Sequence, residues 1–361
     1  MNSKKNSRFE TKPLVNIIIL TYNQFNFISE CLDAVLKSGY PNIRLYLVDN
    51  NSRPEDYKNF YEKYKHLKNA RFFRMKRNKG FAGGCNYALK KIKSGYIVFL
   101  NDDIIVSRNW LTPIISFMEQ NPNVGACQPK IRSKRKPEYF EYAGASGGFM
   151  DVYGFPFARG RIFFNSEKDK GQYESEMDLV WCSGACLITK YEIIKKIGIF
   201  DEIFFIYGEE SDLCWRMNFY GYRLVCIPKS VVYHYGSGTM EKFQYKKAYL
   251  HHRNGLILLL KNYTNFELLK YFPVRIFFDY VAFLYYIFDN KKPMNALAVI
   301  MSHLNILYSL PKILEIRKKE SDKFKMKNSL KYPLYKRSIV LDHFLHKKKK
   351  FSQLRMADFN L

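Results

Sequence analysis

The chain has 361 residues, an apolar fraction of 47% and a formal net charge of +26. The length allows a substantial core in one large or two modest domains, and the apolar fraction is that of an ordinary globular protein. The basic excess favours an anionic partner: a membrane surface, a nucleic acid or a phosphorylated substrate. The seven cysteines are scattered and odd in number, and Cys182 and Cys186 have no second pair to complete a zinc site. Reduced, buried thiols in a cytoplasmic protein are therefore expected.

The first half of the chain alternates strand and helix patterns after a polar, basic segment over 1–12 that lacks the apolar core of a signal peptide. Buried strands are predicted over 15–20, 43–48, 70–75 and 96–100, and helices over 28–36, 57–64 and 80–93. This alternation predicts a parallel, doubly wound sheet with right-handed crossovers. Such sheets bind ligands at the carboxyl edge of their strands.

Polar clusters stand where three of these strands end: Thr21-Tyr22-Asn23, Asp49-Asn50-Asn51 and Asp102-Asp103. Adjacent carboxylates raise each other's pKa unless a cation lies between them. Mg²⁺ or Mn²⁺ held by one or two carboxylates and substrate phosphates fits that position, so a metal and nucleotide-diphosphate site is predicted. The alternative is a solvated turn after a strand.

A glycine-rich segment, Asn78 to Asn86, precedes the fourth strand. Its backbone amides could lie near a phosphate at a helix N-terminus. It matches neither G-x-G-x-x-G nor the Walker pattern, and a close helix–sheet crossing explains its small residues equally well.

The region 126–180 has poor periodicity and many turn residues. Within it, Arg159 and Arg161 could clamp a phosphate or an acidic acceptor, or lie on a solvated loop. Farther on, Glu209, Glu210 and Asp212 open a predicted helix, where they could cap it or supply a general base. His234 follows a short strand, a position where a single histidine is more often structural than a ligand.

In order along residues 15–240, these motifs resemble family 2 glycosyltransferases of the GT-A fold, and within them the bacterial rhamnosyltransferase-like enzymes of surface polysaccharides. The motifs are Thr-Tyr-Asn, Val-Asp-Asn-Asn-Ser, Asn-x-Gly-Phe-Ala-Gly-Gly-x-Asn, Leu-Asn-Asp-Asp, Gly-x-Phe-Asp-Glu, Tyr-Gly-Glu-Glu-Ser-Asp-Leu-Cys-x-Arg and Val-x-His. The resemblance implies an α/β GT-A domain over 13–240 with a doubly wound, mostly parallel sheet. Its Rossmann-like nucleotide-sugar-binding half would span 13–125 and its acceptor-binding, catalytic half 126–240.

The resemblance also implies site roles. The nucleotide-sugar-binding residues would be Thr21, Tyr22, Asn23, Asp49, Asn51, Asn78, Gly80, Phe81, Ala82, Gly83, Asn86, Asn101 and Asp102. Asp103 and His234 would hold Mg²⁺ or Mn²⁺, although Asn101 departs from a strict Asp-x-Asp pattern. The catalytic group would be Glu210, where relatives carry Asp, with Glu209 and Asp212 beside it. The acceptor or phosphate residues would be Arg159, Arg161, Trp181, Gly184 and Arg253.

The expected reaction is inverting transfer of a sugar from dTDP-rhamnose or a UDP-hexose to a hydroxyl of a lipid-linked or growing cell-surface glycan. Processive relatives carry Gln-x-x-Arg-Trp after the base, and the corresponding segment here, residues 249–254, lacks it. Non-processive transfer is therefore expected.

The C-terminal third lies beyond these motifs. Mainly helical structure is predicted over 241–311, with helices over 256–260, 271–288 and 296–310, followed by a basic tail over 312–361. The strongest candidate membrane span, 271–288, carries Arg275 and Asp279, so no transmembrane helix is predicted. Aromatic, amphipathic helices beside a basic tail suggest peripheral docking on the anionic inner face of the plasma membrane. The alternative is a helical subdomain packed on the core with a solvated tail.

Two other function classes remain. One is a basic protein that binds a nucleic acid or a membrane, and the other is a protein with an inactive glycosyltransferase fold. The positive charge is not gathered into a recognised nucleic-acid module, so no nucleic-acid partner is expected. The oligomeric state carries no signal in the sequence.

Overall fold

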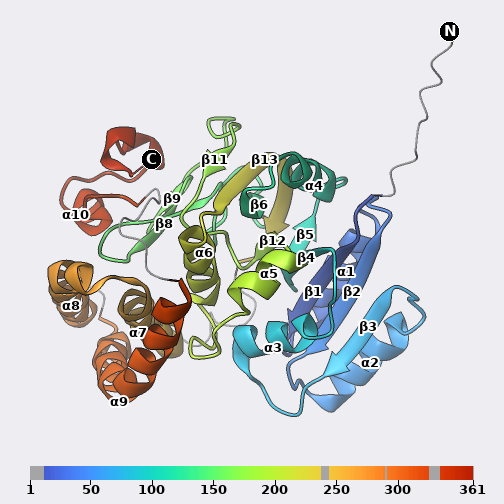
Figure 1. The fold of residues 1–361 in the computed structure, drawn as a ribbon, viewed down its shortest axis with the longest axis horizontal. Coiled ribbons are helices and arrows are strands. Elements are labelled where there is room, and N and C mark those ends of the chain that lie inside the picture. Colours follow the sequence, from blue (N-terminus) through green and yellow to red (C-terminus); the bar gives the residue numbers. More distant parts are fainter. Residues whose placement is uncertain (1–11, 237–243, 289–290, 325–333, 361) are drawn as a thin grey trace, which may run out of the picture.

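The computed structural model describes residues 12–236, 244–288, 291–324 and 334–360 (Figure 1). The predicted basic segment 1–12 lies outside this range except for Lys12.

The centre of the molecule is a mixed sheet with the strand order β11-β13-β6-β12-β4-β1-β2-β3, and β5 pairs with β13. Its strands are β1 (Val15–Thr21), β2 (Ile43–Asp49), β3 (Ala70–Arg74), β4 (Tyr96–Asn101), β5 (Ile104–Val106), β6 (Val124–Ser133), β11 (Met177–Asp178), β12 (Cys186–Lys190) and β13 (Arg223–His234). The four N-terminal strands are mutually parallel, whereas β12 runs antiparallel to both of its neighbours. The predicted doubly wound α/β sheet is confirmed.

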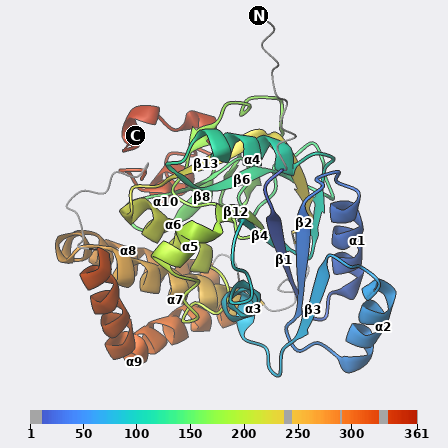
Figure 2. The same cartoon turned by 45° about the vertical axis from the view of Figure 1, so that its right-hand side comes forward.

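Helices cover both faces of this sheet (Figure 2). One face carries α1 (Phe25–Leu36), α2 (Pro54–Tyr64) and α4 (Leu111–Gln120), and the other carries α3 (Gly80–Leu89), α5 (Tyr191–Ile197) and α6 (Glu209–Phe219). A parallel sheet that is buried on both faces requires continuous apolar runs in its strands. Ile17, Ile18 and Ile19 of β1, all fully buried, show why those runs identified the strands.

The region predicted to lack periodicity contains β6, a buried ten-residue strand. Gln128, Pro129 and Lys130 interrupt its apolar pattern, yet Lys130 is buried because its ammonium pairs with Asp169 at 3.1 Å. After β6, a small antiparallel sheet is built from β7 (Gly148–Met150), β8 (Pro156–Ala158), β9 (Arg161–Ile162) and β10 (Asn165–Ser166).

The C-terminal third begins with α7 (Gln244–Asn262), α8 (Asn265–Phe288) and α9 (Pro293–Phe324), each longer than predicted. These helices lie together at one side of the molecule, far from β3 and α2 (Figures 1 and 2). The prediction that no stretch could span a membrane is wrong by length and composition. The helical segments 265–288 and 293–320 are each long and apolar enough to cross a membrane, and only 17% and 28% of their apolar stretches are buried. Core helices of soluble proteins and signal sequences meet the same criteria of length and composition.

The segment predicted as a basic tail divides in the structure. Residues 293–324 form α9, and residues 334–360 fold back onto the small sheet with α10 (Ile339–Phe344). Tyr335 and Phe359 are buried there and pack on Phe157, with ring centroids 5.8 and 6.3 Å away. Aromatic burial therefore fixes a segment that its charge marked as solvated.

Candidate active site

The parallel register brings the predicted nucleotide residues to one sheet edge. Thr21 lies opposite Asp49 across β1 and β2, and Leu20 lies opposite Asn101 across β1 and β4. Asp49 is buried, accepts a hydrogen bond from the Ser52 amide at 2.9 Å, and lies 3.3 Å from the Arg74 guanidinium. This carboxylate therefore shapes the turn after β2.

The turns beyond these strands depend on asparagine. Asn23 and Asn51 adopt positive φ angles of 56° and 70°, which asparagine tolerates better than most residues. Asn50 accepts a hydrogen bond from the Lys79 amide at 3.0 Å and donates to the Asn78 side chain at 3.1 Å. Asn50, for which the sequence predicted no site role of its own, thus connects the turn after β2 to the glycine-rich segment through hydrogen bonds. Tyr22 is 36% exposed beside them.

The glycine-rich segment packs tightly against the loop that precedes α6. A Cβ on Gly80 would lie 2.1 Å from the Phe205 carbonyl oxygen, and the Ala82 amide donates to that oxygen at 3.2 Å. Asn86 is buried and exchanges hydrogen bonds with the Phe200 backbone. The sequence allowed two interpretations of this segment, phosphate binding by its backbone amides and close packing. Close packing accounts for Gly80, Ala82 and Asn86. Gly83 is likewise buried against Lys79, and Phe81 contacts the Phe200 ring.

The predicted metal residues meet because β5 pairs with β13, which sets His234 opposite Ile104. His234 Nε2 lies 2.9 Å from Asp103 Oδ1, and its Nδ1 lies 3.0 Å from Glu141 Oε2. Burial would lower the pKa of His234, but the two carboxylates raise it well above its ordinary value. Burial would raise the pKa of Asp103, but His234 brings it below its usual range. Burial and the neighbouring Asp103 charge raise the pKa of Asp102 to about 8.

The donor set at this position fits a divalent cation. Among the residues that the structure describes, no three His, Cys, Asp or Glu side chains form a metal cluster. Asp103 and His234 supply one oxygen and one nitrogen close together, and Glu141 fixes the far side of the ring, as carboxylates do for metal-bound histidines. Mg²⁺ and related ions often take few protein ligands and complete their shell with substrate phosphates and water.

Glu210 lies in the first turn of α6. Its carboxylate accepts a hydrogen bond from the Gly208 amide at 3.0 Å, and a Cβ added to Gly184 would lie 3.6 Å from the Cβ and the Cγ of Glu210. Burial raises the pKa of Glu210, which makes the carboxylate a better base. Glu209 is also buried, and its pKa is raised well above normal by burial and by Glu210.

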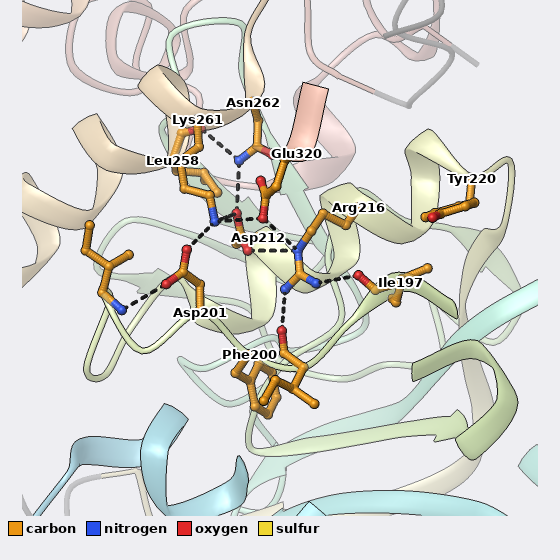
Figure 3. A network of polar contacts seen from close by, with 12 residues as sticks. Ile197, Phe200, Asp201, Asp212, Arg216, Tyr220, Leu258, Lys261, Asn262 and Glu320 are labelled. Atoms are coloured by element: carbon orange, nitrogen blue, oxygen red, sulfur yellow. Dashed lines mark hydrogen bonds and ion pairs between the residues drawn. The ribbon is translucent and has the colours of Figure 1, made fainter. Parts of the chain in front are cut away.

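Asp212 lies in a buried ion cluster between helices (Figure 3). Its oxygens lie 3.0 Å from Arg216 Nε and 2.9 Å from Lys261 Nζ, and Asn262 donates to it at 3.2 Å. The pKa of Asp212 would be raised by burial but is lowered by Lys261 and Arg216. The carboxylate of Asp212 is thus fully buried and engaged by these three partners.

Three predicted acceptor residues are occupied by internal contacts. Arg159 is buried and donates to the Tyr173 and Ser175 carbonyls, and Trp181 donates to the Phe149 carbonyl at 2.8 Å. Arg253 donates to the Ile203 and Phe204 carbonyls. These contacts use donors of Arg159, Trp181 and Arg253 inside the protein, and their assignment as acceptor-binding groups stays a prediction. Arg161 differs, because it donates to only one carbonyl, that of Phe163.

Sequence reasoning missed Glu141 and Asn254. Glu141 lies in an irregular segment without a motif, and only the fold brings it to His234. Asn254 is buried on α7 and donates to the Phe204, Ile206 and Tyr207 carbonyls at 3.0, 2.9 and 2.5 Å. It therefore holds the loop before Glu210, in which Phe205 and Tyr207 have φ angles of 65° and 71°.

The fold is of the GT-A type, and the comparisons with known proteins agree. The sequence model of the family described as Glycosyl transferase family 2 matches residues 16–198. The chain belongs to this family.

Three curated relatives confirm the predicted likeness to rhamnosyltransferase-like members. The chain is 29% identical to the O-antigen biosynthesis protein RfbC of Myxococcus xanthus over 63% of its own length and 18% of the relative's. It is 26% identical to the rhamnosyltransferase WbbL of Escherichia coli (48% and 67% covered). It is 24% identical to the N-acetylglucosaminyl-diphospho-decaprenol L-rhamnosyltransferase of Mycobacterium tuberculosis (47% and 56% covered). The match thus spans only about a fifth of the first relative and just over half of the last.

Solved structures confirm the fold. GalNAc-T7, solved with UDP, GalNAc and Mn²⁺, superposes with a TM-score of 0.51 at 16% identity, covering 78% of this chain and 59% of that one. S. aureus TarS 1-349, solved with UDP-GlcNAc, superposes with a TM-score of 0.50 at 15% identity, covering 86% and 89%.

Proposed function

We propose that this chain is an inverting, metal-dependent, non-processive glycosyltransferase. It moves a sugar from dTDP-rhamnose or a UDP-hexose to a hydroxyl of a lipid-linked or growing cell-surface glycan. The observation that carries the proposal is that one short segment lies beside both chemical groups. A Cβ on Gly184 would lie 3.6 Å from the Glu210 side chain, and the next residue, Ala185, accepts a hydrogen bond through its carbonyl from the Asn101 amide at 3.0 Å, two residues before Asp103.

Each group has one task in this scheme. Glu210 takes the proton of the acceptor hydroxyl, whose oxygen attacks the anomeric carbon from the side opposite the departing diphosphate. Asp103 and His234 would hold the divalent cation, which supplies positive charge for the leaving nucleoside diphosphate when bound. Thr21, Asp49 and Asn101 lie at the sheet edge where the nucleoside would bind.

The relatives and the helical region support this acceptor class. The mycobacterial relative is named for a diphospho-decaprenol acceptor, and a lipid-linked acceptor would require the enzyme to work at a bilayer. Helix α8 exposes Phe277, Leu284 and Phe288 by 63%, 51% and 74%, and Lys291 and Lys292 follow it. Peripheral binding to the anionic inner face of the plasma membrane fits this surface.

Contacts of α8 favour docking in the membrane plane over spanning. Asp279 is buried and lies 3.2 Å from Arg275, 2.9 Å from His252 of α7 and 3.2 Å from His303 of α9. A spanning α8 would have to break this cluster or carry its charges into hydrocarbon, which is costly.

A panel of nucleotide sugars tests the function. Thermal shift and slow hydrolysis are measured for dTDP-rhamnose, UDP-glucose, UDP-galactose and UDP-GlcNAc, with Mn²⁺, with Mg²⁺ and with EDTA. We expect one donor to stabilise the protein and to be hydrolysed in a metal-dependent way that Asp103→Asn removes. Stabilisation by no donor under any condition would contradict the proposal.

A further inference from the structure

Arg161 and Lys247 are two cations without a counter-charge beside the candidate active site. The Arg161 guanidinium lies 4.0 Å from the centre of the Tyr142 ring, and the Lys247 ammonium lies 5.3 Å from the same ring. Arg161 is buried, donates one hydrogen bond to the Phe163 carbonyl at 2.9 Å, and leaves its Nε without a partner. Across the described part of the chain, no carboxylate pairs with either cation.

These contacts separate Arg161 from the other arginines predicted to bind phosphate. Arg159 and Arg253 each donate to two carbonyls and to one neighbouring side chain, whereas Arg161 donates to one carbonyl. Among the described residues, the Nε atoms of Arg159 and Arg161 are both buried without a hydrogen-bond partner, so the number of hydrogen bonds made by the rest of the guanidinium distinguishes them. Burying a guanidinium whose N–H groups lack acceptors costs free energy, unless an anion accepts those hydrogen bonds and balances the charge. Tyr142, 40% exposed, keeps this place open to solvent.

The two cations lie near elements that lead to Glu210 on one side and to the exposed apolar helices on the other. Toward Glu210, the Ala143 carbonyl next to Tyr142 accepts a hydrogen bond from Ser183 Oγ at 2.7 Å, and a Cβ on the following Gly184 would lie 3.6 Å from the Glu210 side chain. Toward the helices, Lys247 belongs to α7, whose His252 ring lies 6.3 Å from the Tyr286 ring of α8, and the neighbouring Tyr285 ring lies 6.5 Å from Phe344 of α10. Phe344 and Phe288 are 54% and 74% exposed. Contacts thus connect a base, two cations and an apolar surface in that order.

We infer that Arg161 and Lys247, with Tyr142, form a subsite for the diphosphate of a prenyl-diphosphate-linked acceptor. Such an acceptor has a sugar hydroxyl, an anionic diphosphate and an apolar chain in the same order. A nucleotide donor offers a diphosphate but no apolar chain, so it matches only part of this arrangement. The inference rests on the proposed transfer reaction and assigns its acceptor class to named residues.

Binding measurements separate the two sources of diphosphate. Titration calorimetry would use farnesyl diphosphate as the acceptor probe, farnesol as the uncharged control, and dTDP and UDP with Mn²⁺ as donor probes. The variants are Arg161→Gln and the partly exposed Lys247→Gln, with Lys58→Gln on the exposed face of α2 as the matched charge control. Thermal unfolding of each variant shows whether it is folded, and Lys247→Gln keeps the test valid should Arg161→Gln unfold.

Each variant should weaken farnesyl diphosphate about tenfold, as expected for one lost charge-assisted contact, and leave nucleotide binding unchanged. Wild-type protein should bind farnesyl diphosphate more tightly than farnesol, and Lys58→Gln should match the wild type. Unchanged farnesyl diphosphate binding in Lys247→Gln, or a loss of nucleotide binding in its place, would overturn the inference. Farnesyl diphosphate binding without any nucleotide binding would contradict the proposed transfer but support the subsite.

Discussion

Glu141 shows how much of this site depends on a residue that touches neither substrate nor the predicted metal directly. Its carboxylate lies 3.0 Å from His234 Nδ1 and thereby turns Nε2 toward Asp103. A Cβ on Gly236 would lie 2.3 Å from Glu141 Oε1, so the backbone after His234 must stay glycine to admit this carboxylate.

We expect Glu141→Gln to weaken metal binding, because the ring loses the negative partner that makes Nε2 a stronger ligand. Removing an outer partner of a metal-bound histidine typically costs roughly 10–100-fold in affinity or activity. Titrating Mn²⁺ in the donor-hydrolysis assay measures this shift, and the exposed Glu138→Gln is the matched control. An unchanged Mn²⁺ midpoint in Glu141→Gln would show that Glu141 plays no part in the site.

At the scale of elements, α3 and the loop before α6 meet at Gly80. The φ angle of Gly80 is +69°, and an added Cβ would clash with the Phe205 carbonyl. Gly80→Ala should therefore displace the loop that carries Glu210. We expect a lower melting temperature and a loss of turnover larger than the loss of nucleotide binding. Gly171→Ala is the control, since its φ is also positive but nothing lies near its Cβ. Equal behaviour of the two variants would contradict this role.

The ion cluster around Asp212 joins α6 to α7 and α9 (Figure 3). Removing one partner from a buried ion pair costs roughly 3–5 kcal/mol, because the remaining charge is left uncompensated. Asp212→Asn should cost about this much in the free energy of unfolding, measured with urea. The exposed pair of Asp178 and Arg223 gives the control Asp178→Asn, which should cost about 1 kcal/mol or less.

The same cluster sets a pH dependence. The folded-state pKa of Asp212 is lowered, so its stabilisation is complete above the unfolded value of about 3.9 and is lost as pH falls toward the folded value. The melting temperature of the wild type should therefore fall more steeply below about pH 4 than that of Asp212→Asn. Parallel melting curves for the two proteins over this pH range would contradict the assignment.

At the scale of the whole molecule, the exposed face of α8 is the surface that we propose to dock on the membrane. Flotation with phosphatidylglycerol vesicles should recover the wild type, with less recovered at high salt or with neutral vesicles. Changing Phe277, Leu284 and Phe288 together to Ser should abolish flotation, because each buried apolar side chain contributes roughly 1.5–3 kcal/mol. Tyr61→Ser, on α2 at the far side of the molecule (Figure 2), should float like the wild type. Flotation of the triple variant would show that α8 is not the docking surface.

The sequence predicted what is local or what ends at the carboxyl edge of a strand. The apolar runs of β1, β2 and β4 and the polar residues after them placed Thr21, Asp49 and Asp103 correctly in one edge, because parallel strands align their ends. The strand predicted over 43–48 was likewise observed, with one residue more at its end, as β2.

Non-local contacts limited the rest of the prediction. Glu141 reaches His234 only through the pairing of β6 with β13. The hydrogen bonds from Arg159 to the Tyr173 and Ser175 carbonyls likewise could not be predicted from the sequence. Strand β6 was missed because Lys130 is buried through an ion pair, and the C-terminal segment because aromatic burial outweighs its charge. In each case the decisive partner is distant along the chain.

The central claim is that Glu210 is the base of a metal-assisted glycosyl transfer. The most direct measurement is turnover of the donor found in the nucleotide-sugar panel with a prenyl-diphosphate-linked sugar acceptor, for the wild type and Glu210→Gln. Nucleotide-sugar affinity is measured in parallel. General-base catalysis contributes about 10²–10⁴-fold, so we expect turnover to fall by that factor while donor affinity stays the same. Wild-type turnover in Glu210→Gln would contradict the claim.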